Sequence, residues 1–167
     1  MRDYIFKFND IGFSLIQNED VDYLIKIDCD SEVREFFPDG VVKKEEIPER
    51  ISKYKSAYDE YGYGCYLVFD LKTNNFIGRA GIGDLDNGET EIGYLITKEL
   101  WNKGYATKIL MALLDWCKRN LKKKRVIAFT PVEHKASERV MQKAGMTFLK
   151  IDIMKGVNCV IYEYKLK

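Results

Sequence analysis

Apolar and polar residues follow two different periods along the chain, and the period indicates which element each segment forms. Alternation with a period of two, or a short apolar run between turn residues, predicts strands. The expected strands are residues 11–17, 65–70, 76–83, 89–96, 125–130, 146–152 and 158–165. Apolar residues spaced three or four positions apart predict amphipathic helices. The expected helices are one capped by Asp20, one over 47–61, one over roughly 135–144, and a long one that turns Ala106, Ile109, Leu110, Leu113, Leu114 and Cys117 inward.

Turn residues separate these elements and set their order. Gly62 and Gly64 end the helix over 47–61, and the Asn87-Gly88 step predicts a hairpin between two neighbouring strands. The sequence strand, long helix, strand predicts a parallel strand pair with a right-handed crossover. The whole order is β-α-α-β-β-β-α-β-α-β-β, which predicts an α/β (α+β) fold with a single central mixed sheet and helices on both faces. No repeat or linker interrupts the chain, so we expect residues 1–167 to form a single domain.

Charge and cysteine usage restrict the partners and the compartment. Lys and Arg number 27 against 26 Asp and Glu, a net charge of +1, which does not favour a nucleic-acid or membrane partner. The four cysteines are far apart and form no Cys-x-x-Cys pair, which is typical of reduced thiols in the cytoplasm. No signal-peptide pattern and no membrane-spanning apolar stretch of about 18 residues occurs. We therefore expect a cytoplasmic protein that does not bind a membrane.

Two motifs are excluded by their context. Gly78, Gly81 and Gly83 resemble part of a dinucleotide fingerprint, but they lie within an expected strand and do not open a helix. His134 is the only histidine and cannot build a metal cluster. It also shares a helix face with Ser137 without the third group that a serine triad requires. The sequence thus predicts neither a metal site nor a hydrolase.

The segment from Leu100 to Thr107 has the character of an anion-binding turn. Gly104 and Ala106 are small where a loop turns into the long helix, so an anion can approach the bare backbone N–H groups. The helix dipole favours a phosphate or pyrophosphate there, and Lys103 and the Thr107 hydroxyl can add donors.

This segment, Trp101-Asn102-Lys103-Gly104-Tyr105-Ala106-Thr107, resembles the acyl-CoA-binding motif of the GNAT acetyltransferase superfamily. Its Trp-x-x-Gly-Tyr-Ala-Thr form is similar to that of the ribosomal-protein α-amino (RimJ/RimL-like) branch. Residues 30–38, 91–96 and 133–146 resemble three further segments of that branch, in the same order. The resemblance covers nearly the whole chain, and the fold of that family agrees with the element order above.

The resemblance implies a GNAT-like N-acetyltransferase domain over residues 1–167. It would transfer an acetyl group from acetyl-CoA directly to a primary amine, with no metal. Backbone groups of the central strand would pair with the pantetheine arm, the turn before the long helix would hold the pyrophosphate, and His134, which replaces the usual Asn, would contact the CoA arm or face solvent at the helix start. The residues implied to bind acetyl-CoA are Leu95, Ile96, Thr97, Asn102, Lys103, Gly104, Tyr105, Ala106, Thr107 and His134.

The reaction needs a base for the ammonium proton and a donor for the departing thiolate. Glu91 lies in phase with Gly93 and Leu95 and is the candidate base, acting directly or through water, with Glu89 as the exposed rival. The tyrosine that many members use as the acid is Met141 here, so the resemblance to the ribosomal-protein branch passes this role to Ser137. Cys117 lies on the apolar face of the long helix and is expected in the core.

Several alternatives remain open. The basic run 118–125 favours a solvated helix end, but it also suits a ribosome- or RNA-associated module, and a CoA-binding domain without catalysis is a second alternative. The acceptor site is expected at residues 34–40, 61–66 and 154–158, the variable parts of this fold. Protein α-amino groups, polyamines, amino acids and aminoglycosides all remain possible acceptors, and the protein could be a monomer or a homodimer.

Overall fold

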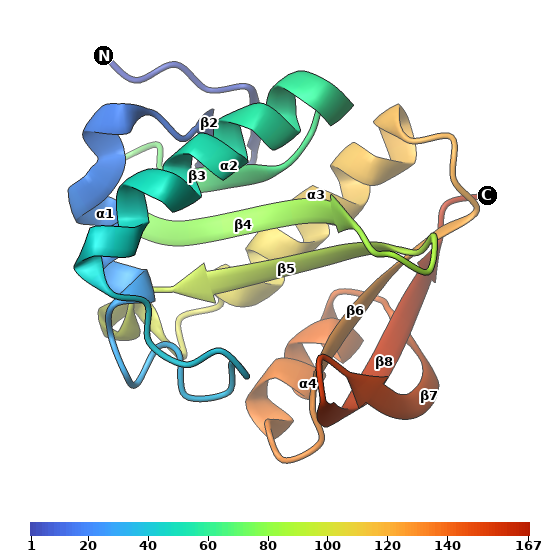
Figure 1. Ribbon diagram of the computed structural model, residues 1–167. Helices are drawn as coiled ribbons and strands as arrows, with labels where there is room; N and C mark the ends of the chain where they lie inside the picture. Colours follow the sequence, from blue (N-terminus) through green and yellow to red (C-terminus); the bar gives the residue numbers. More distant parts are fainter.

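A computed structural model describes residues 1–167, and its strands form one eight-stranded sheet in the order β1-β2-β3-β4-β5-β6-β8-β7 (Figure 1). All neighbouring strands are antiparallel except β5 and β6, which are parallel. The strands are β1 (Phe6–Phe8), β2 (Ile11–Leu15), β3 (Cys65–Asp70), β4 (Phe76–Asp84), β5 (Thr90–Ile96), β6 (Arg125–Pro131), β7 (Thr147–Met154) and β8 (Val157–Lys165). The helices are α1 (Val21–Asp28), α2 (Ile47–Tyr61), α3 (Tyr105–Asn120) and α4 (Lys135–Lys143).

The sheet separates two apolar cores, because successive side chains of a strand point to opposite faces. One core lies under α3 and α4, and the other lies under α1 and α2 (Figure 1). The first includes Tyr66, Val68, Ala80, Ile92, Ile96, Leu110, Leu113 and Met141. The second includes Leu24, Ile47, Ile51, Leu67, Phe69 and Leu95. Each fully buried aliphatic side chain contributes roughly 1.5–3 kcal/mol to folding, so both helix layers are held firmly on the sheet.

The two halves of the sheet separate between β5 and β6. These strands are paired only at Glu91 and Ile127, close to the start of both. Figure 1 shows them near each other where they begin and apart toward their C-terminal ends. The rest of β5 therefore has a free backbone edge on the side of β6.

The expected fold class is confirmed, with small differences in the elements. The additional strand β1 has three residues, too few to show a period, and it forms by pairing with β2 across a turn in which Asn9 has a φ of 51°. The expected cap of α1 is wrong: the Asp20 carboxylate accepts hydrogen bonds from the Gln17 backbone N–H and from Arg2 instead. The expected stop at Gly62 is confirmed, with a φ of 77° at the end of α2. No helix combines the length and the apolar character that crossing a bilayer requires.

Candidate active site

The turn between β5 and α3 presents a row of unpaired backbone N–H groups. Asn102 and Gly104 have φ angles of 60° and 83°, in the left-handed region that Asn and Gly tolerate best. Helix α3 then begins at Tyr105 without a side-chain cap. The first amide to reach a carbonyl is that of Lys108, which donates to Gly104, so the amides of residues 102–107 have no backbone acceptor. These N–H groups at the positive end of α3 suit a pyrophosphate.

The side chains of this turn differ in whether they can donate a hydrogen bond to a bound anion. The side chain of Lys103 is exposed and that of Thr107 is half-buried, and neither makes a side-chain hydrogen bond to the protein. Ala106 packs against the core. The Tyr105 hydroxyl donates to Asp70 Oδ2 at 3.1 Å, which directs its ring toward β3 and leaves only its backbone N–H for a ligand.

The indole of Trp101 fastens this turn to the sheet. Its Nε1–H donates to the carbonyl of Ile96 at 3.0 Å, although the ring is 42% exposed. Sequence reasoning assigned no role to this side chain. It fixes the position of the turn relative to the end of β5.

The expectation that the backbone of Leu95, Ile96 and Thr97 is open to a pantetheine arm is wrong in part. The Thr97 N–H already donates to the Ile77 carbonyl at 3.0 Å. Because bonded and non-bonded pairs alternate along an antiparallel ladder, Leu95 also directs its backbone polar groups to β4. The polar groups at the free edge of β5 are those of Tyr94 and Ile96, and the Ile96 carbonyl already accepts the indole hydrogen bond.

A cavity of about 460 Å³ opens where β5 and β6 separate. It brings together four of the predicted site residues, Glu91, Leu95, His134 and Ser137, while the anion-binding turn lies outside its walls. All three expected acceptor segments also contribute: residues 34–40, 61–66 and 154–158 each place side chains or backbone in its wall. Its further walls come from α2, β4 and β6, through Arg50, Tyr54, Ala57, Arg79, Gly81, Gly83 and Ala128–Pro131.

Glu91 and Ser137 reach this cavity from opposite faces of the sheet. Glu91 shares its face of β5 with Leu95, whose side chain belongs to the core under α1 and α2. Tyr94 points to the opposite face, where it packs against the core under α3 and α4 and meets Ser137 of α4. Because β5 and β6 separate, one cavity is open to both faces of the sheet. The Glu91 carboxylate lies on one face, and the Tyr94 and Ser137 hydroxyls lie on the other.

The environment of Glu91 suits a base. Its side chain is 28% exposed, and it pairs with Lys155 in the β7–β8 turn, with Nζ 3.9 Å from Oε1. Burial raises the pKa of Glu91, and the charge of Lys155 opposes that rise. Glu89, the expected exposed rival, is instead half-buried and ion-paired, and its hydrogen bond with Arg125 lowers its pKa. Glu91 is therefore the better proton acceptor of the two carboxylates.

Ser137 is hydrogen-bonded to a tyrosine that sequence reasoning missed. The hydroxyl of Tyr94 lies 3.1 Å from Ser137 Oγ, and burial raises the pKa of Tyr94. The tyrosine expected from the family on α4 is Met141, which is buried. Residue 94 was visible only as part of an apolar strand, and the alternation of that strand is the signal that could have placed its hydroxyl beside α4.

His134 is half-buried and packs against protein groups, which disfavours the alternative that it faces solvent. Its ring stacks on Phe36 with 3.9 Å between ring centroids, and its Nδ1 lies 3.1 Å from the Thr130 hydroxyl. Burial lowers its pKa. The neutral ring lines the cavity at the start of α4.

Two other expectations concern residues outside the cavity. Cys117 is fully buried in the core, where burial raises the pKa of its thiol to about 12. Within the basic run, Arg119 pairs with Asp115, Lys123 with Asp84, and Arg125 with Glu89 and Glu163. These pairs reduce the positive charge that the run offers to a polyanion.

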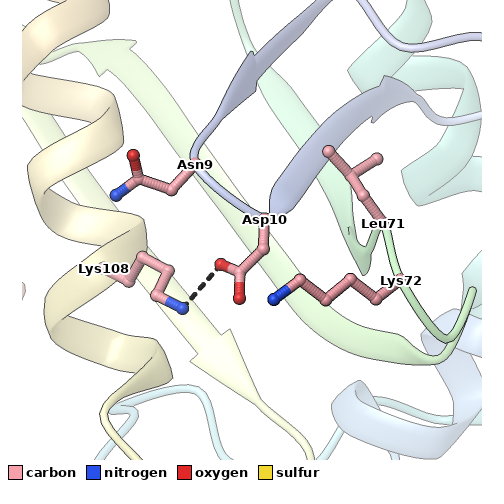
Figure 2. Close-up of a pocket in the computed structure, with 5 residues that line it drawn as sticks. All are labelled: Asn9, Asp10, Leu71, Lys72 and Lys108. Carbon is pink, nitrogen blue, oxygen red and sulfur yellow. Dashed lines mark hydrogen bonds and ion pairs between the residues drawn. The ribbon is translucent and has the colours of Figure 1, made fainter.

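A second hollow lies on another part of the surface and is lined by Asn9, Asp10, Leu71, Lys72 and Lys108 (Figure 2). Lys108 Nζ lies 2.6 Å from Asp10 Oδ1, an ion pair that joins α3 to the β1–β2 turn. It contains none of the predicted site residues and is open to solvent. Its Lys108–Asp10 ion pair connects α3 to the edge of the sheet.

The sequence matches a protein-family model and is similar to two relatives from Bacillus subtilis. The family model of the acetyltransferase (GNAT) domain matches residues 11–147. YnaD of Bacillus subtilis, described as an uncharacterized N-acetyltransferase, is 30% identical over 131 residues, which cover 76% of this chain and 75% of YnaD. YkkB of the same organism, described as an uncharacterized protein, is 28% identical over 129 residues, which cover 75% of both chains.

Solved structures share the fold. A GNAT-family acetyltransferase from Bacillus anthracis has a TM-score of 0.80 at 21% identity, covering 99% of this chain and 97% of its own. The ribosomal-protein α-N-acetyltransferase RimL in complex with coenzyme A has a TM-score of 0.78 at 17% identity, covering 98% of both chains. The match of the domain model to most of the sequence, the resemblance to YnaD and the shared fold agree: the chain belongs to the GNAT family of acetyltransferases.

Proposed function

We propose that the protein transfers the acetyl group of acetyl-CoA directly to a primary amine, with Glu91 as the base and Ser137 as the donor to the leaving sulfur. The observation that carries this proposal is the position of Glu91 and the Ser137–Tyr94 pair on opposite faces of the gap between β5 and β6. An acceptor amine and a thioester can then meet within the gap while each is served by its own proton-handling group.

Binding of acetyl-CoA would use backbone groups for the most part. The free amides of residues 102–107 would hold the pyrophosphate, and the free edge of β5 at Tyr94 and Ile96 would pair with the pantetheine arm like an added strand. The neutral ring of His134 would line the path of the arm beside α4.

The chemical step requires a neutral amine. Glu91 would accept the proton of the ammonium group, directly or through a water molecule, and its raised pKa makes it a stronger base than an exposed glutamate. The amine nitrogen then attacks the thioester carbonyl carbon, a C–N bond forms and the C–S bond breaks. The sulfur leaves with the bonding electron pair, the nitrogen loses its second proton, and this proton neutralises the thiolate, so the products are the amide and the free thiol of CoA.

Ser137 would donate a hydrogen bond to this sulfur as its negative charge develops. A hydroxyl is a weak acid, so its value lies in its position in a partly buried site. The Tyr94 hydroxyl, 3.1 Å from Ser137 Oγ, can orient the serine and share the charge.

Steady-state assays with a panel of amines test the proposal, because CoA release can be followed with a thiol reagent and the acetylated product by mass spectrometry. We expect product formation with acetyl-CoA and a loss of turnover in Glu91→Gln. If acetyl-CoA binds and no amine in the panel is acetylated, the alternative of a CoA-binding domain replaces this proposal. The cytoplasmic location and the choice between monomer and homodimer stay predictions.

A further inference from the structure

The face of the sheet that carries Glu91 has a floor of bare backbone. Gly81 and Gly83 of β4 alternate with residues of the other face, and Gly93 of β5 is the register partner of Gly81. Gly83 is the register partner of Glu91. All of these residues line the cavity. The glycine floor, defined as Gly81, Gly83 and Gly93, thus extends from the candidate base along the face covered by α1 and α2.

Packing does not require these glycines. A Cβ added at Gly83 or Gly93 would meet no atom within 4 Å, and one at Gly81 would make only ordinary contacts from 3.5 Å. At Gly78, in contrast, a Cβ would lie 1.9 Å from the Leu95 carbonyl oxygen, so that glycine allows the close approach of β4 and β5. Side chains on the glycine floor would project into the cavity. The floor keeps open a space that a ligand can occupy.

The end of the floor away from Glu91 carries arginines. Asp28, which is fully buried, binds both Arg34 and Arg79, and Arg34 also pairs with Asp39. These two arginines are therefore matched by two aspartates. At the other end, Glu91 and Lys155 face each other.

Arg50 of α2 is the cation of this cavity that has no acidic partner. Its side chain forms no ion pair, and its only side-chain hydrogen bond to the protein is a long one of 3.4 Å from Nη2 to the Tyr54 hydroxyl. Its Nε is buried without any partner. The guanidinium of Arg79 lies 6.0 Å from the Tyr54 ring, which places Arg50 at the Arg79 end. A buried N–H donor without an acceptor costs about 1–3 kcal/mol, so this end of the cavity favours a ligand group that brings an acceptor to Arg50.

We infer that the acceptor is an extended amine that also carries a carboxylate, with the amine at Glu91, the chain on the glycine floor and the carboxylate at Arg50. This inference rests on the proposed function and names its acceptor class. Gly83, opposite Glu91, and Arg79 are four residues apart on β4, which corresponds to roughly 13 Å at about 3.3 Å per residue. The length suits the N-terminus of a peptide with an acidic side chain at its third or fourth residue.

The same charges disfavour two acceptor classes that the sequence left open. A polyamine or an aminoglycoside would bring a second cation toward Arg50, and like charges repel more strongly in a partly buried site. A free amino acid has its carboxylate next to its amine and cannot reach from Glu91 to Arg50.

The test compares two tetrapeptide amides, Ala-Ala-Glu-Ala and Ala-Ala-Gln-Ala, which differ in one charge at the third residue. We expect the parent protein to acetylate the acidic peptide with a kcat/KM about 10-fold higher, as a hydrogen bond to a charged group implies. In Arg50→Gln this ratio should fall close to one. The matched control is Lys53→Gln, an exposed residue of the same helix that pairs with Glu49, and it should keep the parent ratio.

Peptide binding to the CoA-saturated protein, measured by calorimetry, separates this inference from the proposed function. A preference for the acidic peptide that depends on Arg50 supports the inference even if turnover is absent. Acetylation of both peptides at equal rates, or a preference that persists in Arg50→Gln, overturns it and leaves the acetyltransferase proposal in place. Faster acetylation of spermidine than of either peptide also overturns it.

Discussion

The hydroxyl of Tyr94 lies 3.1 Å from Oγ of Ser137, which links β5 to α4 beside the gap between β5 and β6. The two residues are 43 positions apart in the chain. The link gives the serine, a weak acid on its own, a partner that can orient it toward a thiolate. The contribution of this hydrogen bond to catalysis can be separated from the contribution of each residue by comparing single and double variants.

Ser137→Ala should lower kcat and kcat/KM together and leave acetyl-CoA affinity nearly unchanged, because the hydrogen bond to sulfur strengthens only as charge develops. Tyr94→Phe should have a smaller effect of the same kind. Since the two hydroxyls form one unit, the double variant should be little slower than Ser137→Ala. Steady-state kinetics of the four proteins measure this. Full activity of Ser137→Ala would remove the serine from the mechanism. Its hydroxyl would then serve only the hydrogen bond with Tyr94.

Glu91→Gln should reduce kcat by about 10²–10⁴-fold, the usual contribution of a general base, while acetyl-CoA binds as before. Glu89→Gln is the matched control, because Glu89 lies two residues away in an ion pair with Arg125 and has a lowered pKa. Glu89→Gln should lower the melting temperature, because it weakens the ion pair with Arg125, and should leave kcat close to that of the parent. A Glu91→Gln protein within threefold of parent activity between about pH 6 and 9 would transfer the role to water or to the amine's own deprotonation.

Lys155→Met should move the acidic limb of the kcat/KM profile to higher pH. Burial raises the pKa of Glu91 and Lys155 lowers it, so loss of the cation raises it further. Glu91 must be deprotonated to accept a proton, and a higher pKa then reduces the active fraction at a given low pH. The pH dependence of kcat/KM measures the shift. A limb that stays in place would show that Lys155 does not act on the group that limits the rate at low pH.

Local sequence patterns predicted most helices and strands. The contacts that they did not predict form between segments that are distant in the chain. The period of apolar residues and the glycine at residue 62 predicted α2 and its end, because both depend on neighbours along the chain. The candidate base followed from strand phase in the same way. Lys155 near Glu91, and Tyr94 beside Ser137, depend on how distant segments meet, which one sequence does not show. The pairing of the Thr97 N–H depends on strand register for the same reason.

The buried cluster around Asp28 should dominate the polar contribution to stability. Asp28 is fully buried and binds Arg34 and Arg79. Asp28→Asn would leave two guanidinium groups with one fewer charge partner, and breaking a buried ion pair costs about 3–5 kcal/mol. Urea unfolding measures the change in the free energy of unfolding. A loss below about 1 kcal/mol would show that solvent reaches these arginines and compensates.

Gly104→Val should weaken acetyl-CoA binding strongly. A Cβ at Gly104 meets no protein atom within 4 Å, so the valine would not clash within the fold. It would project from the turn whose free amides, residues 102–107, are proposed to contact the pyrophosphate, and a φ of 83° disfavours a β-branched residue there. Gly88→Val is the control, since Gly88 has a φ of 87°, also meets no atom within 4 Å, and lies in the β4–β5 turn.

Both variants carry the same backbone strain, so their melting temperatures should fall by similar amounts. Only Gly104→Val should lose affinity in calorimetric titrations with acetyl-CoA. Equal affinities in the two variants would mean that the pyrophosphate does not depend on close approach to this turn. The open amides of residues 102–107 would then need another explanation, such as ordered water at the start of α3.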